Sequence, residues 1–131
     1  MPIRVLIATD SLTTREMLRV HLDCLGCNVI AEAVNAAQAL ELFRAAHPDL
    51  VMIDTAVPTT RGIDSLMLMR AVRAELAATT IVIVTSEASG PVASQFDREG
   101  KHNLLLDPGD RGCFNRMWLG LLEIYPELQR R

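Results

Sequence analysis

Four short runs of apolar residues divide the chain, and each run is continuous rather than alternating with polar residues. They lie at residues 5–8, 50–53, 81–84 and 104–106, and a fifth, weaker run lies at residues 28–31. Continuous runs of this length are typical of strands that are covered on both faces, as in a parallel sheet. The pattern therefore predicts five short, buried strands.

Segments with helical spacing follow each run, at residues 13–26, 36–47, 64–76, 91–100 and 111–125. Thr13 and Glu16 fit a capping box at the start of the first segment, and Gly26 fits the position just past its end. Asn35 is a suitable cap for the second segment, and Pro91 is acceptable at the first position of the fourth. Strands and helices therefore alternate five times.

This alternation predicts a single α/β domain over residues 1–131, without repeats or linkers. Right-handed crossovers between parallel strands give a flavodoxin-like, doubly wound sheet with helices on both faces. Five strands suit the order 2-1-3-4-5, whose ligand crevice lies at the carboxyl ends of the strands. The residues that directly follow each apolar run are therefore the candidates for function.

Composition narrows the classes of function. The chain has 131 residues, of which 50% are hydrophobic and 22% are charged, with a net charge of −3. The apolar runs reach about five residues against the roughly 20 that a membrane span needs, and no signal-peptide core precedes the first strand. The pI near 5.5 and the scattered arginines offer no basic stripe for nucleic acid. We expect a cytoplasmic, globular domain that binds neither membrane nor nucleic acid.

The three cysteines do not indicate a disulfide framework, because their number is odd and no export signal is present. Cys24 and Cys27 form a Cys-x-x-Cys pair, but Gly26 between them indicates the C-terminal end of a helix. That end of the helix dipole disfavours a thiolate, and no second pair exists to complete a zinc site. We interpret these cysteines as small apolar residues.

Polar residues follow the strands where a crevice is expected. Thr9 and Asp10 follow the first run, Asp54 the third, Thr85 the fourth and Asp107 the fifth. Asp10 and Asp54 end neighbouring central strands, and two such carboxylates are tolerated when they bind a cation, share a proton or stay solvated. An oxygen-only site with few protein ligands suits Mg²⁺. A pair of solvated aspartates is the alternative.

The chain resembles the receiver domain of two-component response regulators over essentially its whole length. The matching stretches are residues 5–10, 31–33, 38–42, 48–54, 57–58, 62, 81–85, 100 and 105–108. The resemblance implies a non-enzymatic module of phosphorelay signalling, with a histidine kinase or a phosphotransfer protein as its partner. Each motif alone is weak, but their order and spacing together are specific.

The resemblance also implies roles for individual residues. Asp54 would be the nucleophile that accepts a phosphoryl group. Asp10 would bind Mg²⁺ together with Asp54 and the backbone carbonyl of Ala56. Thr85 would turn its hydroxyl toward the phosphoryl oxygens and move the loop that follows it. These roles agree with the chemistry, since phosphoryl transfer depends mostly on positioning and on neutralising charge.

The sequence departs from the family at four positions. Thr9 stands where receivers usually carry an acid, and Asp107 stands where they carry a lysine. Arg61 replaces an acid in the loop after Asp54, and Leu104 replaces the aromatic switch residue. Exchanging lysine for a carboxylate changes the local charge by two units, which predicts slow or weak phosphorylation and a weakened or altered magnesium site.

Two hypotheses address this degenerate site. In the first, Arg61 reaches back over Asp54 and supplies the missing positive charge. In the second, Asp107 joins Asp10 and Asp54 as a third carboxylate and makes a better site for a divalent cation than for a phosphoryl group.

Two other functions stay open. The domain is either phosphorylated on Asp54 or acts as a pseudo-receiver that binds partners without phosphorylation, directly or through an output domain or a homodimer formed by its last two helices. A small flavodoxin-like enzyme or ligand-binding protein is an alternative of another class. Its loop at residues 9–14 is rich in hydroxyl groups but lacks glycine, and the five aromatic residues of the chain are few for enclosing a flavin ring.

Some conspicuous residues have plain interpretations. Met67 and Met69, at helical spacing, are expected to fill the core. We expect His21 to be an ordinary surface residue. Trp118 and Tyr125, seven residues apart on the last helix, are expected to cover the edge of the sheet.

Overall fold

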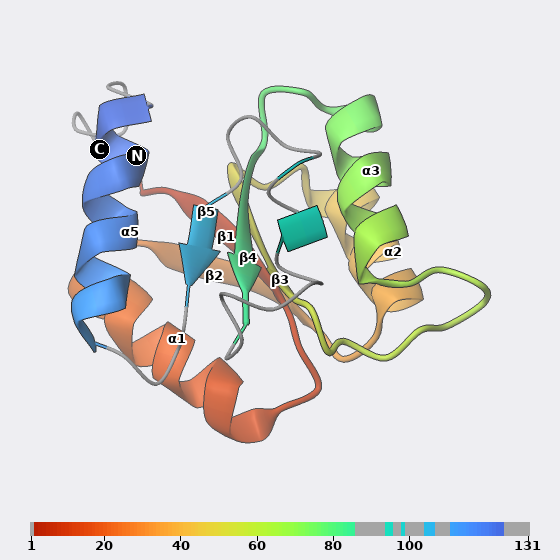
Figure 1. Cartoon of the computed structure of the whole chain (residues 1–131), viewed down its shortest axis with the longest axis horizontal. Helices are drawn as coiled ribbons and strands as arrows, with labels where there is room; N and C mark the ends of the chain where they lie inside the picture. The colour runs from red at the N-terminus through yellow and green to blue at the C-terminus, as the bar shows by residue number, and fades with distance from the viewer. Residues whose placement is uncertain (1, 86–93, 96–97, 99–103, 107–110, 125–131) are drawn as a thin grey trace.

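The computed structural model describes residues 2–85, 94–95, 98, 104–106 and 111–124. Its strands are β1 (Arg4–Ala8), β2 (Asn28–Ala33), β3 (Leu50–Asp54), β4 (Thr80–Val84) and β5 (Leu104–Leu106). They form one sheet in the order β2-β1-β3-β4-β5, and all its pairings are parallel (Figure 1). This is the order that the apolar runs predict.

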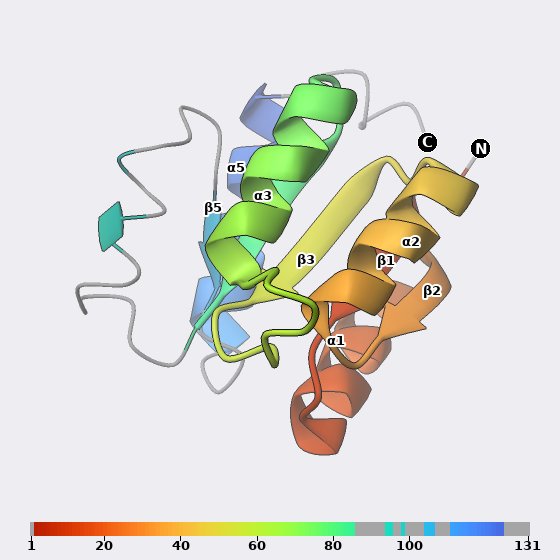
Figure 2. The ribbon, with the colours of Figure 1, turned by 90° about the vertical axis from the view of Figure 1, so that its right-hand side faces the viewer.

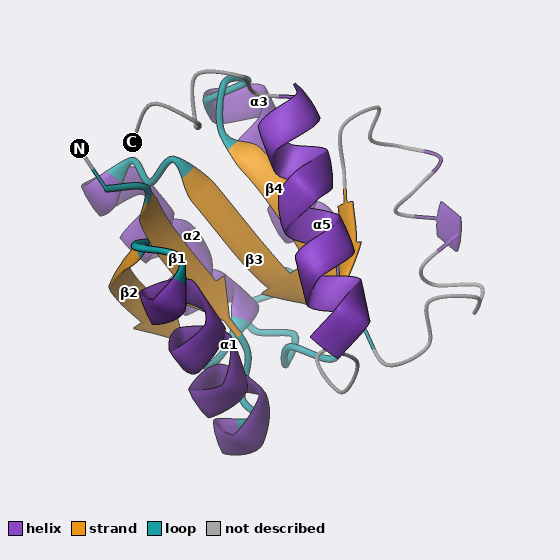
Figure 3. Cartoon of the chain, turned by 90° about the vertical axis from the view of Figure 1, so that its left-hand side faces the viewer, coloured by secondary structure: helices purple, strands orange, loops and turns teal. Residues whose placement is uncertain are grey.

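The described helices are α1 (Leu12–Cys24), α2 (Ala36–Ala46), α3 (Ser65–Glu75) and α5 (Arg111–Ile124). Helices α2 and α3 cover one face of the sheet (Figure 2), and α1 and α5 cover the other (Figure 3). The helix expected at residues 91–100 lies mostly outside the described residues. In the part of the chain that the structure describes, no helix is long and apolar enough to cross a membrane.

The strands supply side chains to two separate cores. Leu6 and Ala8 of β1 pack into a cluster with α2 and α3, whereas Val5 and Ile7 pack into a second cluster with α1 and α5. All four residues are at most 1% exposed. Successive side chains of a strand point to opposite faces, so a strand covered on both sides is apolar at every position. This explains why the runs do not alternate.

Helix α1 begins earlier than the sequence predicts. Ser11 is its N-cap: the backbone there is extended, and the side-chain oxygen accepts a hydrogen bond from the Thr14 N–H at 3.2 Å. The predicted capping box at Thr13 is therefore wrong, because the chain already turns into the helix at Leu12. The other end agrees with the prediction, since Gly26 follows the helix with a φ of 77°.

Helix α2 is capped as predicted. The Asn35 side chain accepts from the Gln38 N–H at 2.8 Å and so satisfies a donor in the first turn. The Gln38 side chain accepts from the N–H of Val34, the residue before the cap, at 2.8 Å. The helix ends at His47, which has a φ of 47°. Arg4 of β1 donates to the His47 carbonyl oxygen at 3.0 Å and so joins this end to the sheet.

The two methionines of α3 lie in different environments. Asp64 caps the helix by accepting from the Met67 N–H at 2.8 Å. Met69 is 1% exposed and lies in the core, whereas Met67 is 45% exposed. Residues two positions apart on a helix lie about 200° apart around its axis, so both could not face the sheet. The prediction of a core position is wrong for Met67.

An aromatic stack joins α1 to α5. The rings of His21 and Phe114 lie 4.5 Å apart between centroids, at an interplanar angle of 22°. His21 therefore packs at a helix interface and is not the ordinary surface residue that the sequence predicts. Trp118 packs against the core cluster that lies between the sheet and helices α1 and α5. Tyr125 lies outside the described residues.

Candidate functional site

The carboxyl edge of the sheet brings Thr9 and Asp54 together. Ala8 of β1 pairs with Ile53 of β3, so the next residues of the two strands face each other. The Thr9 hydroxyl donates a hydrogen bond to Oδ2 of Asp54 at 2.6 Å. Thr9 is 1% exposed, and Asp54 is half-buried. One oxygen of the candidate nucleophile is therefore held by the neighbouring strand.

The other oxygen of Asp54 is held by the loop that follows it. The backbone N–H of Ala56 donates to Oδ1 at 2.8 Å, and the Val57 N–H donates to the Asp54 carbonyl at 3.0 Å. A carboxylate has about four acceptor positions. Among the described residues, the hydrogen bonds from Thr9 and Ala56 use one position on each oxygen, so the carboxylate plane is fixed and each oxygen keeps a further lone pair.

A second hydrogen bond sets the direction of the Thr9 hydroxyl. The Ser11 N–H donates to Oγ1 of Thr9 at 3.1 Å. Because the Ser11 N–H can only donate, the single proton of the Thr9 hydroxyl is used for the carboxylate of Asp54. The Thr9 N–H donates to the Ala33 carbonyl at 3.0 Å and anchors the backbone to β2.

In the sequence, Thr9 stands out only as a departure from the family, and nothing local to it predicts this contact. The strand pairing could have revealed it. If residue 53 lies opposite residue 8, residue 54 lies opposite residue 9. Asp10, the predicted partner of Asp54, is exposed in the connection to α1.

The predicted ligands of Mg²⁺ all bind through oxygen atoms. Asp10 and Asp54 carry carboxylates, and Ala56 lies in the loop that contacts Asp54. Hard oxygen donors in this number fit Mg²⁺, which keeps several waters of its own. Among the described residues, no group of three His, Cys, Asp or Glu side chains is placed to hold a metal. Asp107 lies outside those residues, so the hypothesis of a third carboxylate stays a prediction.

Thr85 lies one residue past the end of β4, next to β3. Asp54 pairs with Val84, and the Thr55 N–H donates to the Val84 carbonyl at 3.0 Å. Thr85 is 7% exposed. The register therefore brings its backbone to the same edge as Asp54, and its role as a switch hydroxyl stays a prediction.

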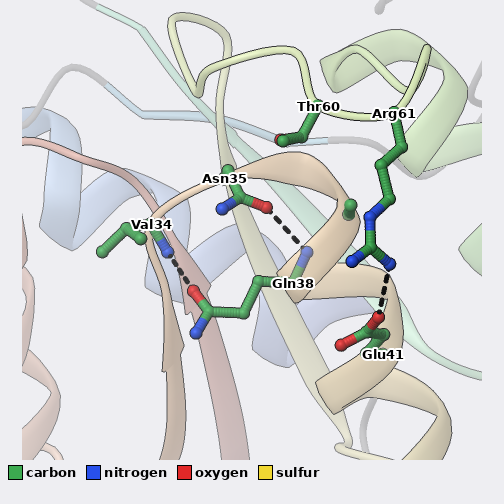
Figure 4. Close-up of a pocket in the computed structure, with 7 residues that line it drawn as sticks. Val34, Asn35, Gln38, Glu41, Thr60 and Arg61 are labelled. Carbon is green, nitrogen blue, oxygen red and sulfur yellow. Dashed lines mark hydrogen bonds and ion pairs between the residues drawn. The ribbon is translucent and has the colours of Figure 1, made fainter.

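Arg61 does not reach over Asp54, as the first hypothesis about the degenerate site proposed. Its guanidinium pairs with Glu41 of α2 at 3.2 Å, and the two side chains are 77% and 66% exposed (Figure 4). The pair borders a pocket of about 190 Å³ between the β2–α2 and β3–α3 connections. Arg61 and Gly62 both have a positive φ, of 52° and 77°, which turns the loop toward α2. The hypothesis that Arg61 covers Asp54 is wrong.

Comparison with known proteins assigns the family. Residues 5–112 match the family model of the response regulator receiver domain. The chain belongs to this family. Receiver domains are generally non-enzymatic signalling modules that bind Mg²⁺ and interact with histidine kinases and output domains.

Several characterised proteins contain similar receiver domains. The chain is 38% identical over 72 residues to the chemotaxis protein CheY of Bacillus subtilis, covering 55% of this chain and 60% of CheY. It is 33% identical over 86 residues to the autoinducer 1 sensor kinase/phosphatase LuxN of Vibrio harveyi, covering 66% of this chain and 10% of LuxN. The chain thus spans less than two thirds of these curated relatives.

A solved structure has the same fold. The signal receiver domain of the putative response regulator NarL from Mycobacterium tuberculosis superposes with a TM-score of 0.75 at 26% identity. The superposition covers 93% of this chain and 97% of the NarL domain. The likeness extends across nearly the whole receiver domain.

The cysteines agree only in part with their interpretation as small apolar residues, because Cys24 is exposed. None of Cys24, Cys27 and Cys113 forms a disulfide bond. Cys27 is buried, and this burial raises the pKa of its thiol to about 11. A buried thiol with a raised pKa is a poor nucleophile at neutral pH.

Proposed function

We propose that this receiver domain accepts a phosphoryl group on Asp54 from a phosphohistidine of a histidine kinase or a phosphotransfer protein. The observation that carries this proposal is the fixed carboxylate at the end of the central strand. Thr9 holds one of its oxygens at 2.6 Å and Ala56 holds the other at 2.8 Å. A half-buried carboxylate held in this way is oriented before a donor arrives.

The transfer exchanges one bond to phosphorus for another. A lone pair of an Asp54 carboxylate oxygen forms the new oxygen–phosphorus bond and gives an acyl phosphate. The nitrogen–phosphorus bond of the donor breaks, and its electron pair returns to the imidazole, which takes a proton from water. Such a step depends mainly on in-line positioning and on stabilising charge, and the two hydrogen bonds of Asp54 contribute to positioning.

Asp10, Asp54 and the backbone carbonyl of Ala56 would hold Mg²⁺ in this proposal. The ion would neutralise negative charge on the phosphoryl oxygens. Thr9 places a neutral hydroxyl where the family usually has an acid, so the site has one carboxylate fewer. We therefore expect Mg²⁺ to bind more weakly than at a site with all the usual acids.

The site is degenerate on its other side as well. Asp107 stands at the usual lysine position, and Leu104 of β5 stands at the aromatic switch position. An uncompensated charge contact near 4 Å costs about 1 kcal/mol in water and about 4 kcal/mol at an intermediate effective dielectric. We therefore expect slow phosphorylation and a conformational response that does not use the usual aromatic switch.

A second candidate is a pseudo-receiver that binds partners without phosphorylation. The contact between Arg61 and Glu41 favours it, because an arginine that forms an ion pair with Glu41 does not supply the positive charge of the missing lysine. In both functions the domain acts without enzymatic turnover, in the cytoplasm, on a histidine kinase, an output domain or a second copy. The family match leaves the flavodoxin-like ligand-binding alternative without support.

Intact-mass spectrometry separates the two candidates. The domain is incubated with Mg²⁺ and either acetyl phosphate or a phosphorylated histidine phosphotransfer protein. Phosphoacceptor function predicts the gain of one phosphoryl group, which an Asp54→Asn variant abolishes. Asp49→Asn is the matched control, since Asp49 directly precedes β3, at the opposite end of the strand from Asp54. Lack of any gain with both donors would favour the pseudo-receiver.

A further inference from the structure

We infer that Thr9 is a positioning residue that orients Asp54 and couples the state of its carboxylate to the N-terminus of α1. The rate effect rests on the proposed phosphorylation of Asp54, whereas the coupling exists in the unmodified protein. Thr9 bonds to Asp54 at 2.6 Å and accepts from the Ser11 N–H at 3.1 Å.

These contacts form a directed chain of hydrogen bonds. The N–H of Ser11 donates to Thr9, and the hydroxyl of Thr9 donates to Asp54. Ser11 is also the N-cap of α1, whose side chain accepts from the Thr14 N–H at 3.2 Å. Hydrogen bonds in a chain polarise one another. A change of charge at Asp54 therefore alters the hydrogen bonds at the first turn of α1.

Burial makes this arrangement specific. Thr9 is 1% exposed, so water does not readily replace its hydroxyl on the strand side of Asp54. The backbone of Thr9 is anchored to β2, where the Thr9 N–H donates to the Ala33 carbonyl at 3.0 Å. Its hydroxyl is held between Asp54 and the Ser11 N–H, so the residue is fixed by its backbone and by its side chain, as a precise positioning contact requires.

Orientation matters more than nucleophile strength in this reaction. A hydrogen bond withdraws charge from a carboxylate oxygen and weakens it as a nucleophile. The transition state of phosphoryl transfer is loose in most analyses, with catalysis supplied mainly by positioning and electrostatics. Losing the Thr9 hydroxyl therefore slows phosphorylation of Asp54.

The first test measures coupling in the unphosphorylated protein. The amide chemical shift of Ser11 is recorded by NMR for the wild type, Asp54→Ala, Thr9→Val and the double variant. We expect Asp54→Ala to move the Ser11 signal, and to move it less than about a third as far when Thr9 is valine. Equal displacement in both backgrounds overturns the inference.

The second test measures phosphorylation rates with acetyl phosphate at saturating Mg²⁺. Thr9→Val, which keeps the shape and removes the hydroxyl, is expected to slow the reaction roughly tenfold, as for loss of one hydrogen bond to a charged group. Thr9→Ser, which keeps the hydroxyl, is expected to restore most of the rate. Thr13→Val makes the same change at an exposed position of α1 and is the control.

The outcomes separate the inference from the function on which it rests. If the wild type gains no phosphoryl group, the proposed function fails, while the NMR cycle still decides the coupling. If the wild type is phosphorylated but Thr9→Val reacts at the wild-type rate, the positioning role fails. Thermal unfolding of each variant checks the fold, and Thr9→Ala replaces Thr9→Val if valine prevents folding.

Discussion

The guanidinium of Arg61 lies 3.2 Å from the carboxylate of Glu41, which ties the β3–α3 connection to α2. The pair is exposed, and exposed ion pairs contribute little to stability. Its position nevertheless decides what Arg61 can do, since a side chain turned to α2 does not neutralise a phosphoryl group on Asp54.

Replacing Arg61 should therefore leave phosphorylation almost unchanged. We expect Arg61→Ala to react with acetyl phosphate within about twofold of the wild-type rate, because an exposed pair is worth less than about 1 kcal/mol. Intact mass against time gives the rate. A tenfold loss would show that Arg61 turns from Glu41 to Asp54 during the reaction.

Restoring the family's lysine should speed the reaction. Asp107→Lys removes a negative charge and adds a positive one, so we expect the phosphorylation rate to rise about tenfold or more. Asp23→Lys, on the exposed end of α1, makes the same change of charge elsewhere. If both variants are phosphorylated faster by the same factor, the change of net charge and not the position of Asp107 is responsible.

The same variant tests whether Asp107 helps to bind a cation. Titration with Mg²⁺ compares the wild type with Asp107→Lys. If Asp107 is a third carboxylate ligand, the variant binds Mg²⁺ more weakly. Tighter binding by the variant would contradict the three-carboxylate hypothesis.

The corrected start of α1 makes a prediction about stability. Ser11→Ala removes the side-chain oxygen that accepts from the Thr14 N–H and should cost about 1 kcal/mol. Thr13→Ala should change the free energy of unfolding little, because Thr13 lies inside the first turn and is exposed. Urea denaturation measures both, and a larger cost at Thr13 would restore the capping box.

The order of elements could be predicted from the sequence because the burial of a strand determines which of its positions are apolar. Strands covered on both faces need an apolar residue at every position, and β3 and β4 have such runs. The chemistry of caps is also local, which is why Asn35 was identified correctly. At α1 two hydroxyl residues satisfied the same rule, and the path of the backbone selected Ser11.

Contacts between distant segments could not be predicted in the same way. Thr9 and Asp54 are 45 residues apart, and their hydrogen bond depends on strand register. The stack of His21 on Phe114 depends on how two helices cross. Arg61 looked close to Asp54 along the chain, but its left-handed backbone turns the loop elsewhere.

The two cysteines of the Cys-x-x-Cys pair should differ in reactivity. Cys24 is exposed, whereas the pKa of buried Cys27 is raised to about 11. At pH 8.5 we expect iodoacetamide to alkylate Cys24 and to leave Cys27 unmodified, as peptide mass mapping would show. Equal labelling in urea is the control, and equal labelling of the folded protein would contradict the buried position.

Burial of Cys27 also implies a dependence of stability on pH. The folded state favours the neutral thiol, so this stabilisation is complete below the ordinary thiol pKa of about 8.5. It is lost as the pH rises toward about 11, the pKa in the fold. Cys27→Ala should remove this alkaline loss, whereas Cys24→Ala should retain it in thermal unfolding scans.

A further pH effect is expected between α2 and α3. Arg44 donates to both oxygens of Glu75, at 2.8 and 3.0 Å, and this hydrogen bonding lowers the pKa of the Glu75 carboxyl. The pair therefore stabilises the fold fully above the unfolded pKa of about 4.3, and this contribution is lost as the pH falls through the lower pKa of the folded state. Glu75→Gln should lower the melting temperature slightly at pH 7, and the difference from wild type should shrink as the pH is lowered into the acid range.

Among the described residues, the sheet separates two apolar clusters that have no buried side chain in common. Asp54 is the last residue of the central strand β3, which supplies side chains to both clusters. One of its oxygens is linked through Thr9 toward α1, and the other is linked to the loop that leads into α3. A single modification at this carboxylate thus affects hydrogen bonds that lead to helices on opposite faces of the sheet.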